Sequence, residues 1–139
     1  MSTRETELTA YHESGHAVVS RFLAHHDPVY KITIIPRGLR MGSTRFLATK
    51  DRSYITRGEF RDAVVAALGG HAAETVVFGE VSTGSGDDIE RATNIVRRMV
   101  TEFGMSERLG LVAFGRQQQM MFLGCEIVSS ATTRSALGS

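Results

Sequence analysis

Residues 12–16 read His-Glu-Ser-Gly-His, and this short pattern limits the local structure more than any other part of the chain. On an α-helix, positions i and i+4 lie on one face, so His12 and His16 can bind one zinc ion while Glu13 reaches a water molecule beside it. Three fixed letters at this spacing arise by chance with a probability of roughly 2% in such a chain. The motif therefore predicts a helix carrying His12 and His16 as zinc ligands and Glu13 as a general base for hydrolysis.

The residues around the motif favour the same helix. Apolar residues recur at helical spacing from Leu8 to Leu23. Ser2 and Glu5 match the pattern of a capping box, and Pro28 follows where a helix cannot continue. We expect a helix that begins near Glu5 and ends before Pro28.

The rest of the chain predicts an α+β domain that is mainly α-helical, with a small β-sheet. Residues 29–35 are rich in β-branched and aromatic side chains and predict a strand, and residues 43–48 alternate as a second strand would. An apolar stripe predicts a second helix from Phe60 to about Val77, although the glycines at 69 and 70 weaken it. After a loop at 79–86, a third helix is expected, with Gly104 at its C-terminal cap.

Composition excludes several other classes of protein. The chain has 139 residues, enough for one domain, and its net charge of +1 gives no reason to expect a nucleic-acid partner. Cys125 is the only cysteine, which excludes a disulfide framework and a cysteine-based structural zinc site. No run approaches the roughly 18 apolar residues of a membrane span, and no signal peptide is recognisable. The chain itself is therefore expected to be soluble.

A catalytic zinc needs a third protein ligand. A metzincin would have glycine and histidine where this chain has Val19 and Phe22, and no glutamate follows the motif before Glu59. Asp88 heads the apolar stripe of the third predicted helix, so its carboxylate should point inward. It could equally well be a helix cap, because acidic residues are favoured in a first turn. Spacing alone does not decide whether Asp88 is a zinc ligand or a helix cap.

Several further motifs, in this order and spacing, resemble the peptidase domain of the FtsH family of membrane-anchored AAA+ zinc proteases. They cover roughly residues 8–128: Ala10 to Ala17, Ile34 to Gly38, Ala67 to Gly70, Ala72 to Glu74, Thr83 to Ile89, Arg91 to Thr93, Met105 to Glu107 and Phe122 to Gly124.

The resemblance implies a zincin-type peptidase fold and a zinc metalloendopeptidase that cleaves unfolded or damaged proteins. It implies that His12, His16 and Asp88 hold one Zn²⁺ and that Glu13 is the base. Glu74 aligns with a family glutamate near the metal, where it would either orient a ligand imidazole or be a solvated carboxylate. The strand at 43–47 is a candidate for binding substrate as an added strand. His71 stands where the family usually has arginine, and we expect it at a surface or interface.

The family architecture also includes transmembrane segments, an AAA+ ATPase module and C-terminal helices that are not recognisable here. It implies a hexameric ring on the cytoplasmic side of a membrane. A Walker A site needs a lysine directly after a glycine, and the only lysines, Lys31 and Lys50, do not follow one. ATP would therefore act only through an ATPase module in cis or in trans.

We therefore expect a C-terminally truncated peptidase domain over 1–128 and a disordered tail over 129–139. The chain is either a piece of a longer protein or a stand-alone copy. Two alternatives to an active peptidase are a non-cleaving structural subunit of a protease ring and a truncated metal-binding fragment. Intact His12, Glu13, His16 and Asp88 argue against the structural subunit.

Overall fold

The computed structural model describes residues 2–48 and 54–113 of the chain. The motif Phe122 to Gly124, Cys125 and the predicted tail at 129–139 lie outside the described residues. Two compact units meet at Thr93 and Asn94. The first unit holds the elements that surround the His-Glu-Ser-Gly-His motif, and the second contains the later part of the last helix among the described residues.

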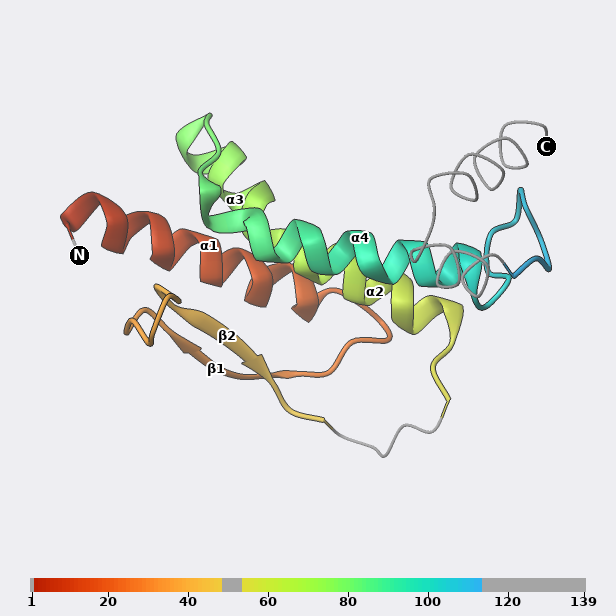
Figure 1. Ribbon diagram of the computed structural model, residues 1–139. Helices are drawn as coiled ribbons and strands as arrows, with labels where there is room; N and C mark the ends of the chain where they lie inside the picture. The colour runs from red at the N-terminus through yellow and green to blue at the C-terminus, as the bar shows by residue number, and fades with distance from the viewer. Residues whose placement is uncertain (1, 49–53, 114–139) are drawn as a thin grey trace. The chain divides into compact units, whose positions relative to one another are not determined.

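The first unit is built around one long helix. Its elements are α1 (Thr3–Arg21), β1 (Val29–Thr33), β2 (Ser43–Phe46), α2 (Arg57–Ala67), α3 (Gly69–Phe78), the 3-10 turn η1 (Thr83–Ser85) and the start of α4 (Gly86–Thr101). Helix α1 packs against both strands on one side and against α2 and α3 on the other (Figure 1). The predicted fold class, α+β and mainly helical with a small sheet, is confirmed.

The start of α1 shows why the helix forms where it does. The Ser2 hydroxyl accepts the amide proton of Glu5 at 3.1 Å, and the Glu5 carboxylate accepts that of Ser2 at 2.8 Å. This reciprocal pair satisfies two amides that the first turn leaves without helical partners. The predicted capping box is confirmed, and it makes Ser2 the N-cap, so the helix begins at Thr3 rather than near Glu5.

The two strands pair with each other, as expected, and they run antiparallel, with Ile32 opposite Thr44 and an irregularity between Val29 and Lys31. Both are shorter than predicted, because β1 ends at Thr33 and β2 ends at Phe46. Leu47 adds one more backbone hydrogen bond, to the Pro28 carbonyl at 2.9 Å. The sheet therefore stays small and lies along α1.

The predicted second helix is two helices. Helix α2 ends at Ala67 and α3 begins at Gly69, with Leu68 between them. The expectation of one helix through to Val77 was wrong at this point, and the pair of glycines that weakened it stands at the break. Gly69 and Gly70, which follow this break, both lie close to α1.

Helix α4 continues into the second unit and ends at Thr101. Gly104 then adopts a left-handed φ of 59°, as expected of a residue that ends a helix. Within this unit Arg98 and Glu102 form an exposed ion pair at 3.1 Å. The residues that follow turn back in a bridge between Ser106 and Gly110.

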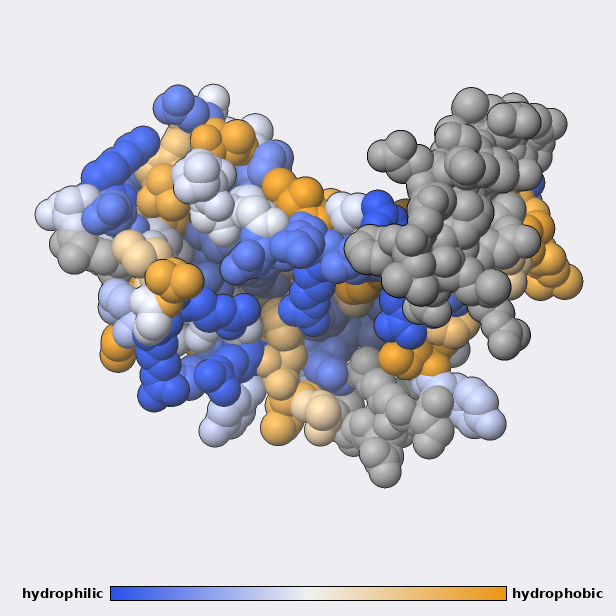
Figure 2. All heavy atoms as spheres, viewed as in Figure 1, coloured by the Kyte–Doolittle hydropathy of each residue, from blue (hydrophilic) through white to orange (hydrophobic). Residues whose placement is uncertain are grey.

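The described residues bury little large apolar surface. The buried hydrophobic side chains among them are four alanines and Met99, while Phe22, Leu39 and Tyr54 are among many large apolar residues that are exposed. Figure 2 accordingly shows apolar residues scattered among polar ones on the face in view. The largest fully buried side chains among the described residues are instead polar: Glu74 is 0% exposed and Ser85 1%. Buried polar groups of this kind need partners, and they point to the site.

No helix in residues 2–48 and 54–113 is both long and apolar enough to cross a membrane.

Candidate metal centre

Helix α1 presents His12, Glu13 and His16 to the interior of the first unit, and all three are buried. The two imidazole rings follow each other by one helical turn and meet edge to face, with ring centroids 4.8 Å apart. Their Nε2 atoms lie 3.1 Å apart. The i, i+4 spacing has therefore brought two potential metal ligands to one point.

Asp88 joins them from the first turn of α4. Its Oδ2 atom lies 2.9 Å from Nε2 of His12 and 3.1 Å from Nε2 of His16. One donor atom from each of the three residues falls within 4.8 Å of the others, the one such group of three among the described residues. The carboxylate of Asp88 thus points inward at the imidazoles.

The Nδ1 atoms of both rings, on the side away from Asp88, donate hydrogen bonds. Nδ1 of His16 donates to the Ala66 carbonyl oxygen at 2.8 Å, and Nδ1 of His12 donates to Oε2 of Glu74 at 2.6 Å. Because a carbonyl or a carboxylate can only accept, the Nδ1 atoms carry the protons, and the Nε2 atom of each neutral ring presents a lone pair. This is the arrangement found for metal-binding histidines, whose second nitrogen is held by a carboxylate or carbonyl.

The donor set therefore fits a zinc ion. With both rings neutral, two nitrogen lone pairs and one carboxylate oxygen face each other at about 3 Å, and only a cation or added protons can hold them there. Two imidazole nitrogens and one carboxylate oxygen are also a donor set that catalytic zinc accepts, with a further position left for water or substrate.

The pKa shifts of the three residues also show that positive charge is favoured at this point. Burial disfavours a charge on His12, but hydrogen bonds with Asp88 and Glu74 outweigh burial and raise the pKa of His12. Burial is likewise outweighed at His16, where Asp88 and the Ala66 carbonyl raise its pKa. Burial would raise the pKa of Asp88, but its bonds to the two imidazoles hold that pKa well below its usual range.

Both carboxylate oxygens of Glu74, a residue of α3, accept hydrogen bonds. Its Oε1 atom accepts the Ser82 amide at 2.8 Å, and its Oε2 atom accepts the Ser85 hydroxyl at 3.3 Å as well as Nδ1 of His12. Of the two alternatives left open by the sequence, the solvated carboxylate does not fit a side chain with no exposed surface. The turn around η1 is thereby tied to the imidazole of His12.

Glycines allow α3 to come this close to α1. A Cβ atom on Gly69 would lie 2.7 Å from the Gly15 carbonyl oxygen, and a Cβ on Gly15 would lie 2.6 Å from Cβ of Ala73. A Cβ on Gly70 would fall 2.5 Å from atoms of the His12 ring. Sequence reasoning took Gly69 and Gly70 only as weak helix formers; adjacent glycines inside a helical pattern were the signal that could have indicated a close approach.

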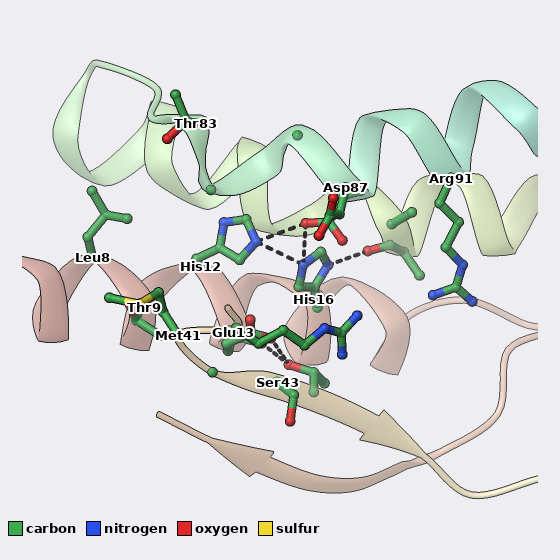
Figure 3. A pocket seen from close by; sticks show the side chains of 18 of the residues that line it. Leu8, Thr9, His12, Glu13, His16, Met41, Ser43, Thr83, Asp87 and Arg91 are labelled. Carbon is green, nitrogen blue, oxygen red and sulfur yellow. Dashed lines mark hydrogen bonds and ion pairs between the residues drawn. The ribbon is translucent and has the colours of Figure 1, made fainter. Parts of the chain in front are cut away.

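Glu13 and the three converging residues line a cleft of 420 Å³ between α1, β2, α2 and the start of α4. The Glu13 carboxylate reaches β2, where the Thr44 hydroxyl lies 2.8 Å from Oε2. Figure 3 shows Arg91 on α4 and Met41 before β2 around the same cleft. Thr44 was not recognised from the sequence as a neighbour of the motif, because nothing local to it signals a partner 31 residues away.

The remaining histidines lie outside the group of three. His71 is half-buried on α3, and His25 is exposed beyond the end of α1. His26 stacks edge to face on Phe46, with ring centroids 4.4 Å apart, at the border of the cleft.

Comparison with known proteins gives a consistent picture. The model of peptidase family M41 matches residues 1–137 of the chain. The ATP-dependent zinc metalloprotease FtsH 1 of Sphaerobacter thermophilus is 54% identical over 127 residues, which are 91% of this chain and 19% of the relative. FtsH 1 of Thermomicrobium roseum is 54% identical over 127 residues, 91% of this chain and 20% of its own length. FtsH 3 of Symbiobacterium thermophilum is 54% identical over 123 residues, which are 88% of this chain and 20% of the relative. The chain thus spans about a fifth of the length of these relatives.

Proposed function

The chain belongs to peptidase family M41, and from that premise we propose that it is a zinc metalloendopeptidase in which His12, His16 and Asp88 hold the metal and Glu13 is the general base. The observation that carries the proposal is the convergence of two Nε2 atoms on Oδ2 of Asp88, with both Nδ1 atoms committed to acceptors on the outer side. Glu74 is not the third ligand in this proposal, because its carboxylate faces Nδ1 of His12 rather than Nε2.

A zinc ion bound there would act as a Lewis acid, polarising a peptide carbonyl and making a nearby water molecule easier to deprotonate. The chain's own groups do the rest. Glu13 removes a proton from the attacking water and returns it to the nitrogen of the leaving amine. Asp88 supplies a negative charge that offsets the metal, and Glu74 keeps the His12 ring in the orientation that exposes Nε2.

The substrate we propose is an extended, unfolded polypeptide. The cleft is open beside β2, and residues 43–47 offer backbone groups with which an added strand could pair. Such pairing reads the backbone more than the side chains, which suits a peptidase that accepts many sequences. Because the similar proteins carry the name ATP-dependent zinc metalloprotease, we propose that an AAA+ ATPase module delivers the polypeptide. On the family resemblance, the working assembly is a hexameric ring at the cytoplasmic face of a membrane.

Metal content and cleavage measured on the same preparation test this function. We expect the purified chain to melt cooperatively, to carry about one zinc ion and to cleave casein, a substrate that needs no unfolding. A chelator should abolish cleavage, and added zinc should restore it. Folded, zinc-loaded chain that leaves casein intact would favour a non-cleaving subunit of a ring, and folded chain without affinity for zinc would refute the metal centre.

A further inference from the structure

The hydroxyl of Thr44 joins strand β2 to the carboxylate of Glu13. Its Oγ1 atom lies 2.8 Å from Oε2 of Glu13 and 2.7 Å from the Glu13 backbone carbonyl oxygen. Thr44 is half-buried, and its backbone is fixed in the sheet opposite Ile32. One residue of β2 therefore contacts both the main chain and the side chain of the same helical residue.

The contact depends on an unusually close approach of β2 to α1. A Cβ atom on Gly42 would lie 2.6 Å from the Thr33 carbonyl oxygen, 2.7 Å from Cγ2 of Thr9 and 3.3 Å from Cγ of Glu13. Any larger residue at 42 would push the strand away from the helix. The absence of a side chain at Gly42 thus sets the distance at which Thr44 meets Glu13.

The hydroxyl of Thr44 has one proton and faces two acceptors. The carbonyl oxygen is neutral and the carboxylate is charged, and a hydrogen bond to a charged acceptor is the stronger of the two. The proton is therefore directed at Oε2. The other carboxylate oxygen, Oε1, makes no hydrogen bond with the part of the chain that the structure describes.

From this asymmetry we propose that Thr44 is a positioning residue, which holds the Glu13 carboxylate by Oε2 and leaves Oε1 as the oxygen that takes and returns the proton. The proposal rests on the function proposed above, in which Glu13 is the base. A carboxylate held at one oxygen is aimed before the substrate arrives, and such alignment contributes to the rate of the chemical step rather than to substrate binding. Without the hydroxyl, Glu13 would sample rotamers that point away from the reacting water.

Kinetics on casein-derived peptides separate positioning from substrate binding. Thr44→Val keeps the shape of the side chain and removes the hydroxyl; we expect kcat to fall on the order of tenfold, with KM and zinc content within about twofold of the parent. Thr44→Ser restores the hydroxyl and should restore kcat. Thr93→Val is the matched control, because the Thr93 hydroxyl donates to a helix carbonyl, that of Ile89, at 2.7 Å on an exposed face of α4.

A change in KM alone would mean that Thr44 acts on substrate binding, and an unchanged kcat in Thr44→Val would mean that the hydroxyl does not position the base. Either result overturns the proposal, and so does a failure of Thr44→Ser to restore kcat. Thr44→Ala, measured beside Thr44→Val, should show the same loss; it replaces the valine variant if that one does not fold.

A second readout needs no activity. In zinc-loaded chain labelled with ¹³C at the glutamate carboxyl carbons, the Glu13 signal is identified as the one missing from Glu13→Gln. We expect Thr44→Val to move this signal, and Thr44→Ser and Thr93→Val to leave it in place. An unmoved signal in Thr44→Val would overturn the positioning role. If the zinc-loaded parent cleaves nothing, the proposed function fails, while the Glu13 signal still decides whether Thr44 holds the carboxylate.

Discussion

Oε2 of Glu74 lies 2.6 Å from Nδ1 of His12, on the side of the imidazole ring that faces away from Asp88. The same carboxylate accepts the amide of Ser82 and the hydroxyl of Ser85, and it has no exposed surface. A buried carboxylate is stable only with such partners. The orientation of one proposed zinc ligand is thus fixed by a residue 62 positions away in the sequence.

Replacing this charge should weaken metal binding without removing a proposed ligand. Glu74→Gln keeps the size of the side chain, but its amide cannot match the charge–imidazole contact, and its NH₂ group would face donors where the carboxylate accepts. We expect zinc affinity, measured by competition with a chelator, to fall about 10- to 100-fold. The exposed neighbour Glu80 provides the control, because Glu80→Gln should bind zinc as the parent does. Equal affinity in both variants would remove Glu74 from the metal site.

Gly70→Ala tests the close approach of α3 to α1. The new Cβ would meet the His12 ring at 2.5 Å, so either the helix or the ring must move. Overpacking of this kind typically costs about 1–3 kcal/mol, and displacement of the ring should also lower zinc affinity. Gly86→Ala is the control for stability: nothing lies within 4 Å of its Cβ and its φ is −55°, so we expect about 0.4–1 kcal/mol of stabilisation. Chemical denaturation checks both, and a Gly70→Ala variant as stable as the parent would contradict the contact.

Local signals in the sequence were sufficient for the elements that carry the site. The capping box at Ser2 and Glu5, the pairing of the two strands and the helix holding His12 and His16 all follow from spacing within a few residues. For Asp88 the place at the head of an apolar stripe left an inward carboxylate and a helix cap equally open, and only the family resemblance favoured the zinc ligand.

Contacts between distant segments were not predictable in the same way. Helix α2 ends at Ala67 and α3 begins at Gly69, where Gly69 approaches Gly15. The adjacent glycines could have indicated a close approach, but not which segment approaches them. The contact of Thr44 with Glu13 likewise depends on where β2 lies against α1. Such pairs are determined by tertiary packing, which overrides local preference.

Glu13→Gln separates the proposed base from the proposed ligands. The amide keeps the shape of the side chain but cannot accept a proton from water, so we expect kcat to fall about 10²- to 10⁴-fold. Zinc content should stay at the parent level, because neither imidazole nor Asp88 is changed. Measuring casein cleavage and bound zinc on the same sample decides the question. Parent-like cleavage by the variant would mean that another group is the base.

Zinc affinity should depend on pH through the two histidines. The pKa values of His12 and His16 are raised in the metal-free chain, so their protonated forms persist above the ordinary value of about 6.5. Zinc requires neutral imidazoles, and binding therefore releases protons. We expect affinity to rise with pH above about 6.5 and to level off once both rings are neutral, while the metal-free chain loses stability over the same window. Chelator competition across this pH range measures the zinc affinity, and melting curves measure the stability of the metal-free chain. An affinity independent of pH would contradict ligation by these rings.

The assignment of Asp88 as third ligand has a direct test in Asp88→Asn. Asp88 is the third residue of α4, and its Oδ2 atom is within about 3 Å of both Nε2 atoms. The amide carries no charge to offset Zn²⁺ and is a poorer ligand, so the variant should bind zinc much more weakly and lose cleavage.

Asp87→Asn is the matched control for zinc affinity, because residue 87 is rotated by about 100° from residue 88 around the helix and cannot aim at the same point. If Asp88 acted only through the first turn of α4, its asparagine variant would keep zinc and lose at most about 1 kcal/mol of stability, since asparagine is also favoured at helix starts. Chelator competition on the parent and both variants distinguishes the two cases. Equal affinity in all three proteins would return the third-ligand assignment to another carboxylate of the cleft.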